Sequence, residues 1–173
     1  AGEFLGKIIA PSSMLNRVIV SQRVPDTSTF QAVDEAPLLT STDRWFRPVD
    51  IKVGPDGAIY LADWYDTRLS HVSPVDDWSK EDGRIYRIRA AGASPSREKF
   101  DLHTASPAVL LGYLKHPNKW FRRQAALELY WRDEKQTLAA LESLARDPGN
   151  AHAFDAVGAI ELLGGMRDEL AGE

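Results

Sequence analysis

Two carboxylates at the end of a predicted strand are the first residues that could do chemistry. Asp63 and Asp66 flank the aromatic pair Trp64 and Tyr65. Strand ends and the loops that follow them often carry ligand-binding groups, so a hard cation or sugar hydroxyls could bind there. The alternative is structural, because aspartates in turns accept hydrogen bonds from backbone N–H groups. The spacing of two carboxylates alone favours the structural interpretation, and the binding interpretation stays open.

A histidine and an arginine lie on either side of this pair. A neutral imidazole at His71 could take a hydroxyl proton during sugar oxidation, since its ordinary pKa suits a general base. His71 could equally bind a metal or hydrogen-bond within its loop. Arg47 could hold a quinone or a substrate carboxylate through two parallel hydrogen bonds. A salt bridge from Arg47 to Asp43 or Asp50 is the alternative of equal weight.

Composition excludes several classes of site and partner. The 173 residues include no cysteine, which excludes disulfides, thiolate metal sites, a cysteine nucleophile and covalent haem attachment within the chain. The formal net charge is -4 and no run of Lys or Arg stands out, so we expect no nucleic-acid partner. No apolar stretch approaches the roughly 20 residues that span a bilayer, and we expect no transmembrane segment.

The elements that must position these residues form an antiparallel sheet in the first half of the chain. Residues 49–53 alternate apolar and polar side chains, and residues 58–62 continue as a second strand. Between them, Gly-Pro-Asp-Gly at 54–57 predicts a tight hairpin turn. A third strand is predicted at 83–89, which gives a three-stranded meander.

The region before this meander is predicted to be less regular. Residues 16–20 have the composition of a strand, whereas Pro25 and Pro37 predict a mostly irregular segment at 21–46. A single sheet of this kind has two faces and open edges and is marginal by itself. We therefore expect further strands to cover it.

The second half of the chain has the periodicity of helices. A small, polar segment at 91–104 is predicted to be a linker, and residues 105–173 a helical repeat. Ser106 with Pro107 predicts the start of a first helix, and Asn118 the cap of a second.

Two more helices are expected, one from about 134 to 146 and one capped by Asn150. Short helices separated by Pro and Gly turns suggest antiparallel pairs stacked as a solenoid. A small four-helix bundle is the alternative. The segment 116–123 (HPNKWFRR) favours the repeat, because helix-pair repeats often end a short helix in His-Pro and open the next with Trp and Arg. The fold class expected is thus α+β in sequence order.

One stretch of the chain closely resembles a known family. Residues 40–66 (TSTDRWFRPVDIKVGPDGAIYLADWYD), His71 and residues 83–88 (GRIYRI) resemble the membrane-bound, haem-binding dehydrogenases of planctomycetes and verrucomicrobia. The resemblance covers nearly the whole chain and is densest over 40–88. In that family, position 66 often holds Asn.

The resemblance implies a fold and a layout. Its first domain is similar to soluble pyrroloquinoline-quinone sugar dehydrogenases, which are six-bladed β-propellers, and a HEAT-type repeat follows. Residues 1–90 would then be the last blade and part of the preceding one. The remaining blades would be partners, and a haem c domain would lie outside this chain. The protein would reside in the periplasm or cell envelope.

The resemblance also implies functions for the site residues. In a quinoprotein-like sugar or alcohol dehydrogenase, His71 and Arg47 would be catalytic. Asp63, Trp64, Tyr65 and Asp66 would bind substrate or cofactor, with pyrroloquinoline quinone and calcium as the expected cofactors. The alternative function is a non-catalytic carbohydrate- or protein-binding scaffold. In either case we expect the segment alone to be inactive as an enzyme, because a sixth of a propeller cannot close.

Overall fold

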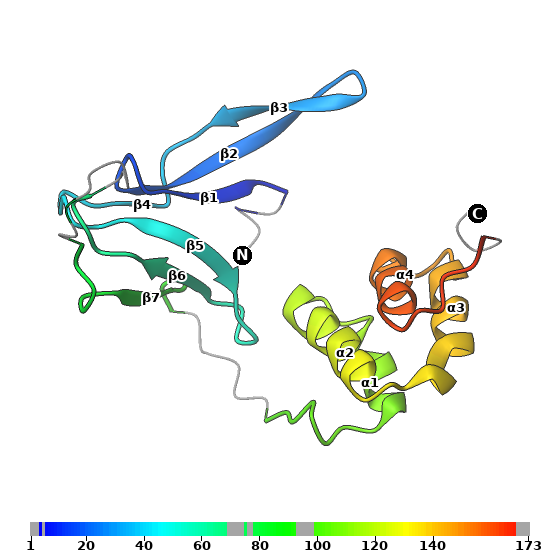
Figure 1. Ribbon diagram of the computed structural model, residues 1–173. Helices are drawn as coiled ribbons and strands as arrows, with labels where there is room; N and C mark the ends of the chain where they lie inside the picture. Colours follow the sequence, from blue (N-terminus) through cyan, green and yellow to red (C-terminus); the bar gives the residue numbers. More distant parts are fainter. Residues whose placement is uncertain (1–3, 5, 69–74, 76–77, 93–98, 169–173) are drawn as a thin grey trace. The chain divides into compact units, whose positions relative to one another are not determined.

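The structure is a computed structural model, and it divides the chain into two compact units. The first unit spans residues 1–95 and the second spans 96–173 (Figure 1). The structure describes all residues except 1–3, 5, 69–74, 76–77, 93–98 and 169–173. We call the two parts the β unit and the helical unit, and describe each by itself.

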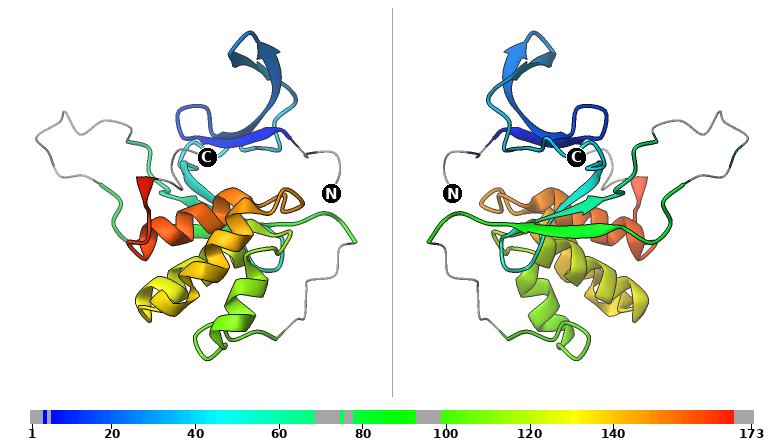
Figure 2. Two further views of the ribbon diagram at one scale, coloured as in Figure 1. Left: turned by 90° about the vertical axis from the view of Figure 1, so that its right-hand side faces the viewer. Right: turned by 90° about the vertical axis from the view of Figure 1, so that its left-hand side faces the viewer.

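The β unit contains two antiparallel sheets. In the first, β1, β2 and β3 follow one another and β4 pairs with the start of β2; in the second, the order is β5-β6-β7 (Figures 1 and 2). The strands are β1 Ile8–Ser12, β2 Arg17–Asp26, β3 Thr29–Asp34, β4 Leu39–Thr40, β5 Pro48–Val53, β6 Ile59–Asp63 and β7 Arg84–Ile88.

The predicted meander is confirmed, and its hairpin turn has the chemistry expected. Gly57 has φ of 73°, which a glycine adopts without steric cost. The side chain of Asp56 accepts a hydrogen bond from the N–H of Ala58 at 3.1 Å. The N–H of Gly57 donates to the carbonyl of Gly54 at 3.0 Å. These bonds set the register of β5 against β6.

The prediction of an irregular segment at 21–46 is wrong for its first part. β2 runs through Pro25 to Asp26 and pairs with β3 along that length. Pro25 lies beyond the residues of β2 that pair with β1, so the strand has a neighbour there on one side only. A missing N–H costs least at such an open edge, and proline was therefore a poor guide to where this strand ends.

The core of the β unit lies between its sheets. Val18 of β2, Leu61 of β6 and Phe46 form one buried cluster, with Ile51 and Ile88 packed against it. Burial of each large side chain stabilises the fold by about 1.5 to 3 kcal/mol. The opposite side of the second sheet is less covered, because Ile85 is 77% exposed and Val49 is half exposed.

The helical unit contains four α-helices among the residues that the structure describes. They are α1 Pro107–Tyr113, α2 Lys119–Trp131, α3 Leu138–Arg146, preceded by a short 3-10 turn, and α4 Ala153–Leu162 (Figure 2). Their core is apolar and includes Leu110, Phe121, Leu129, Leu141 and Ile160. No helix in the described part of the chain is long and apolar enough to cross a membrane.

Two of the three predicted helix caps are confirmed. The Ser106 hydroxyl accepts from the N–H of Val109, and the Asn118 side chain accepts from the N–H of Trp120. Asn150 instead accepts from the N–H of His152 at 3.0 Å, within a turn, and α4 begins only at Ala153. An Asn side chain bonds a turn two residues on as readily as it caps a helix, so the pattern did not distinguish the two.

Part of the segment predicted to be a linker packs on the helices. Leu102 is buried in the helical core, and the ring of Phe100 contacts Trp120 and Phe121 edge to face. These two apolar residues lie among small and polar ones in the sequence, so the composition of the segment did not indicate that they pack on the helices.

Candidate functional site

The carboxylate of Asp63 closes the turn that follows β6. Asp63 is only 3% exposed, and its Oδ1 accepts from the backbone N–H of Arg47 at 2.7 Å and of Tyr65 at 3.0 Å. A backbone hydrogen bond joins the same two segments, because the N–H of Trp64 donates to the carbonyl of Arg47 at 2.9 Å. Within the described residues, Oδ2 of Asp63 is buried and has no hydrogen-bond partner.

The carboxylate of Asp66 fixes the next part of the same loop. Its Oδ1 accepts from the N–H of Arg68, and its Oδ2 accepts from the N–H of Ser79, each at 2.9 Å. The indole N–H of Trp64 donates to it as well. The pKa of Asp66 is lowered, and the hydrogen bond from the Arg68 N–H is the largest cause; together with the smaller contributions of Ser79 and Trp64 it outweighs desolvation, which acts in the opposite direction. Asp66 thus joins the loop to the segment that precedes β7.

The two aspartates do not converge on a shared point. Three of their four oxygens accept backbone N–H bonds, which is the geometry of turn capping. No group of three or more His, Asp or Glu side chains that could hold a metal occurs among the described residues. A binding function for Asp63 and Asp66 therefore stays a prediction, while their positioning function is visible.

Tyr65 occupies an unusual backbone conformation between them. Its φ is 51°, which costs a residue with a Cβ about 1 kcal/mol or more and persists only where the surroundings hold it. The ring of Tyr65 lies 5.7 Å from the ring of Trp45, and the guanidinium carbon of Arg84 lies 3.3 Å from its centroid. Contact with Tyr65 is also the main reason why the pKa of Arg84 is raised. Tyr65 therefore holds the Arg84 head group in place.

Trp64 is half exposed, yet its ring is held on several sides. The indole N–H is bonded to Asp66, and the ring meets Trp78 edge to face at 6.0 Å. Arg68 stacks on the other ring of this pair, with its guanidinium carbon 4.5 Å from the centroid of Trp78. Arg68 is fixed in turn by a bond to the carbonyl of Val75 at 2.8 Å. Trp64 therefore presents a fixed aromatic surface to solvent.

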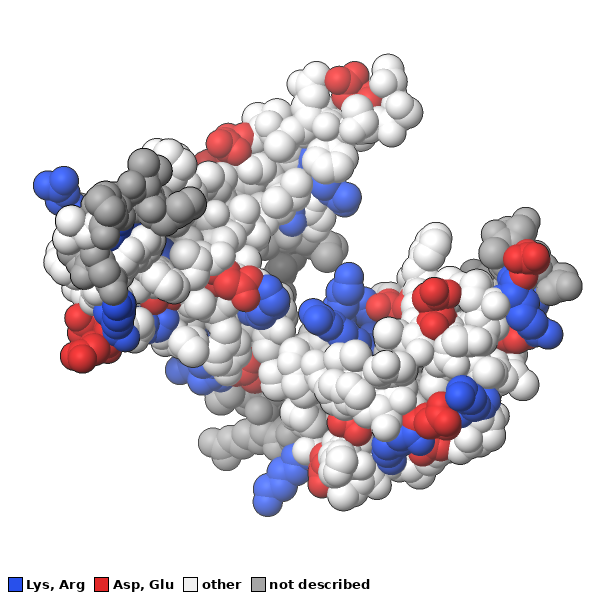
Figure 3. All heavy atoms as spheres, viewed as in Figure 1, with Lys and Arg blue, Asp and Glu red and all other residues white. Residues whose placement is uncertain are grey.

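An open hollow of about 610 Å³ lies beside Trp64 on the less covered side of the second sheet. Its apolar wall comes from β5, β6 and β7, and its polar rim from the segment leading into β7. In the view of Figure 3, basic and acidic side chains lie scattered among each other. The lining residues are Val49, Ala62, Asp63, Trp64, Ser79, Lys80, Gly83, Arg84 and Ile85.

Arg47 is buried, and its side chain contacts the loop that follows β6. It is 8% exposed, and its guanidinium donates to the carbonyls of Phe46 and Thr67, each at 3.3 Å. Neither Asp43 nor Asp50 forms an ion pair with it among the described residues, and its Nε has no hydrogen-bond partner there. The predicted catalytic His71 lies outside the described residues.

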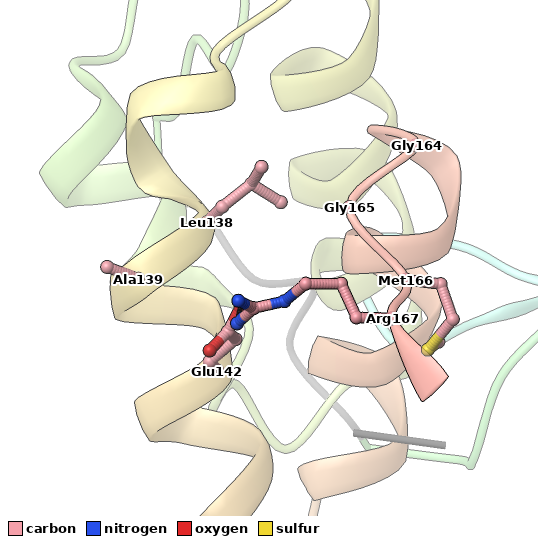
Figure 4. A pocket seen from close by; sticks show the side chains of 7 residues that line it. All are labelled: Leu138, Ala139, Glu142, Gly164, Gly165, Met166 and Arg167. Carbon is pink, nitrogen blue, oxygen red and sulfur yellow. Dashed lines mark hydrogen bonds and ion pairs between the residues drawn. The ribbon is translucent and has the colours of Figure 1, made fainter. Parts of the chain in front are cut away.

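The helical unit has a hollow of its own, which has fewer features of a ligand-binding site than the hollow beside Trp64. It lies between α3 and the residues after α4, and Figure 4 shows Glu142 and Arg167 meeting across it. The Glu142 carboxylate is shared by Arg146 and Arg167. The remaining lining is apolar side chains and glycine backbone from Leu138, Ala139, Gly164, Gly165 and Met166. With its acid already paired, this hollow lacks a polar group to orient a ligand.

The structure brings together four predicted residues and three unpredicted ones. Asp63, Trp64, Tyr65 and Asp66 form one loop as expected. Arg68, Trp78 and Arg84 complete it, and these three were not among the predicted site residues. The available signal was the alternation in 83–89, which places Arg84 and Tyr86 on one face of the strand.

Comparison with known proteins adds one match. A protein-family model described as a domain of unknown function, DUF7133, matches residues 2–92, more than half of the chain. The match covers the β unit and its hollow. No curated protein and no solved structure matches the chain.

Proposed function

The chain belongs to the DUF7133 family, and from the geometry of its β unit we propose that it binds carbohydrate through Trp64. One observation carries the proposal: Trp64 is 50% exposed beside the hollow while Asp66 and Trp78 fix its ring. An exposed tryptophan with free rotation is a common surface feature. An exposed tryptophan that its neighbours hold at the edge of a hollow is suited to bind a ligand.

The chemistry of the hollow suits a sugar. The C–H face of a pyranose ring packs on an aromatic ring, which supplies a large apolar contact area. Hydroxyl groups then need polar partners at the edge, and Ser79, Lys80 and Arg84 line that edge. Pockets for small ligands combine apolar walls with a few polar groups in this way.

The hydrogen bonds of the loop reduce the cost of binding. Ordering a mobile side chain on association costs about 0.5 to 1.5 kcal/mol. Asp63 and Asp66 have already ordered the backbone around Trp64, and Arg47 holds that loop from the buried side. The aspartates therefore serve the ligand indirectly, as positioning residues.

Calorimetric titration with a panel of oligosaccharides tests this proposal. We expect Trp64→Ala to weaken binding about tenfold or more, since it removes the main contact area. The matched control is Trp131→Ala in the helical unit, where Trp131 is 62% exposed and lines no described hollow. Equal affinities of the two variants, or no binding of any oligosaccharide, would contradict the proposal.

The second candidate function is a sugar or alcohol dehydrogenase, with Arg47 and His71 at its catalytic centre. The observation that favours it is a pair of buried polar atoms, Arg47 Nε and Asp63 Oδ2, without partners among the described residues. Such atoms are costly unless something satisfies them. The described side chains do not fit calcium, which takes about six to eight oxygen ligands. Of the four carboxylate oxygens of Asp63 and Asp66, only Asp63 Oδ2 accepts no hydrogen bond from the described residues.

Dye reduction distinguishes this second candidate. The full-length protein would be supplied with pyrroloquinoline quinone and calcium and assayed on a panel of sugars and alcohols. Turnover that His71→Ala abolishes, with sugar binding retained, would support the dehydrogenase. Absence of turnover in the presence of Trp64-dependent binding would leave the carbohydrate-binding function alone.

We further propose that the β unit belongs to a larger β structure of the cell envelope, completed by further propeller strands. Val53 on β5 and Ile85 on β7 are exposed apolar side chains, and edges of the two sheets are open. Because residues 1–173 contain no cysteine, Val53→Cys would introduce one cross-linking site into this part of the protein. Cross-links from it to strands outside residues 1–95 in the full-length protein are expected. Cross-links confined to the helical unit would contradict the propeller.

A further inference from the structure

We infer that β3 binds a second copy of this chain, and that the two β3 strands pair antiparallel across a two-fold axis. The inference is independent of the proposed carbohydrate binding. It comes from the β2–β3 hairpin, whose second strand is an outer strand of the first sheet (Figure 1). All residues of β3 are exposed, and no described strand pairs with its outer side.

The backbone of β3 presents hydrogen-bonding groups to this open edge. In an antiparallel pair, residues alternate between bonding the neighbouring strand and pointing away from it. The N–H of Glu35, which directly follows β3, donates to the carbonyl of Val20 on β2 at 2.8 Å. The alternation then directs the N–H and C=O groups of Phe30, Ala32 and Asp34 outward. These are the groups that a further strand would bind.

β3 lacks the features that protect the other long outer strands from pairing. Proline and charged side chains are the usual protection, because proline removes a donor and a charge resists burial at a strand edge. β1 carries Pro11, β5 carries Lys52 and β7 carries Arg87. Residues 29–33 of β3 (TFQAV) include neither a proline nor a charged residue. Among the described strands, β3 therefore has the edge best suited to pairing.

The sequence of β3 complements itself in one register. A two-fold axis at Gln31 places this residue opposite its own copy, Phe30 opposite Ala32 of the second copy, and Thr29 opposite Val33 of the second copy. A large ring then lies beside a small side chain, and two β-branched side chains face each other. No like charges meet, because residues 29–33 have none. The outward-pointing residues 30 and 32 also meet each other, so the backbone hydrogen bonds can form in this register.

Sedimentation equilibrium of the full-length protein over a range of concentrations tests the inference. Two paired strands of six residues make a small interface, and interfaces below about 1,200 Å² are typical of transient complexes. We therefore expect a monomer–dimer equilibrium in which the dimer forms at the upper end of the range.

A charge on the pairing edge should weaken this dimer. Ala32→Lys should raise its dissociation constant about tenfold or more, and because Ala32 is exposed the folded hairpin accommodates the longer side chain. The matched control is Gln22→Lys on β2. Gln22 is also exposed but lies one strand away from the edge, opposite Val33, so the dissociation constant should stay within about twofold of the wild-type value.

A disulfide between identical residues reports the register. Gln31→Cys should link to its own copy on air oxidation, because opposed residues of a non-hydrogen-bonded pair have Cα atoms about 4.5 Å apart, within the range of a disulfide. Mass spectrometry identifies two identical linked peptides, which can come only from two copies. Val33→Cys is the matched control, since it lies on the same face of β3 but opposite Thr29 of the second copy, and it should not link to itself.

Each measurement can overturn the inference. A monomer at every concentration would do so, as would a dimer that Ala32→Lys leaves unchanged. Equal self-linking of Gln31→Cys and Val33→Cys would contradict the two-fold register. None of these results depends on Trp64, so carbohydrate binding stands or fails by its own titration.

Discussion

Replacing Asp63 by alanine is the most informative perturbation of the β unit. The substitution deletes the acceptor of two backbone N–H groups, those of Arg47 at 2.7 Å and Tyr65 at 3.0 Å. It also leaves a cavity where a side chain that is 3% exposed had been. No other described side chain accepts from these two N–H groups, so both lose their partner.

The size of the effect follows from the count of lost partners. Leaving a buried donor unsatisfied costs about 1 to 3 kcal/mol, so two donors cost about 2 to 6 kcal/mol. The stability of a whole domain is about 5 to 15 kcal/mol, and this loss is a large part of it. Tyr65, with its φ of 51°, should leave its strained conformation first.

Native-state hydrogen exchange is the appropriate assay, because two compact units need not unfold together. Peptides that cover residues 47–68 should exchange about 30-fold to about 20,000-fold faster in Asp63→Ala, at about 1.4 kcal/mol per factor of ten. Peptides from α2 serve as an internal reference and should keep their wild-type rates.

Asp43→Ala is the matched control for this prediction. Asp43 also accepts a backbone bond, from the N–H of Trp45 at 2.9 Å, but in an exposed turn where water can replace it. We expect a loss below about 1 kcal/mol there. If the two alanine variants exchange at the same rates around the loop, the positioning function assigned to Asp63 is refuted.

Three further predictions concern other parts of the chain. Arg122→Met should lower the free energy of unfolding of the helical unit by about 3 kcal/mol in urea, followed by circular dichroism at 222 nm, because it strands the partly buried Asp155 carboxylate that its Nε binds at 2.8 Å. A loss below 1 kcal/mol would contradict this. The pKa of Asp66 is lowered mainly by the N–H of Arg68, so its stabilisation is complete above the unfolded pKa of about 3.9 and disappears as pH falls through the lower folded pKa. Asp66→Asn should therefore make exchange of the loop less sensitive to acid below about pH 4, and parallel pH curves would speak against it. Gly57→Ala should destabilise the β5-β6 hairpin by about 1 kcal/mol, seen as faster exchange at 52–60, because φ is 73° there; unchanged exchange would show that the turn has relaxed.

Local chemistry made much of the fold predictable. The turn at 54–57 and the caps Ser106 and Asn118 depend on bonds between residues at most three apart, and the sequence displays both partners. β3, by contrast, depends on pairing with β2 across a sheet edge. Its residues, Thr29–Asp34, are all exposed, so no hydrophobic pattern marks it.

The candidate site was predictable in its anchor residues and not in its geometry. The spacing of Asp63 and Asp66 pointed to a turn, and the structure has their oxygens bonded to backbone N–H groups. The contacts of Trp64 with Trp78 and of Tyr65 with Arg84 join residues 14 and 19 positions apart, so pattern within one strand could not indicate them.

The proposed function requires that sugar covers the exposed ring of Trp64. Hydroxyl-radical footprinting of the protein with and without a saturating oligosaccharide measures that coverage at each tryptophan in one experiment. We expect Trp64 to be oxidised readily in the free protein and protected in the complex, and Trp131 to be oxidised equally in both. Oxidation of Trp64 that saturating sugar leaves unchanged would contradict the proposed function.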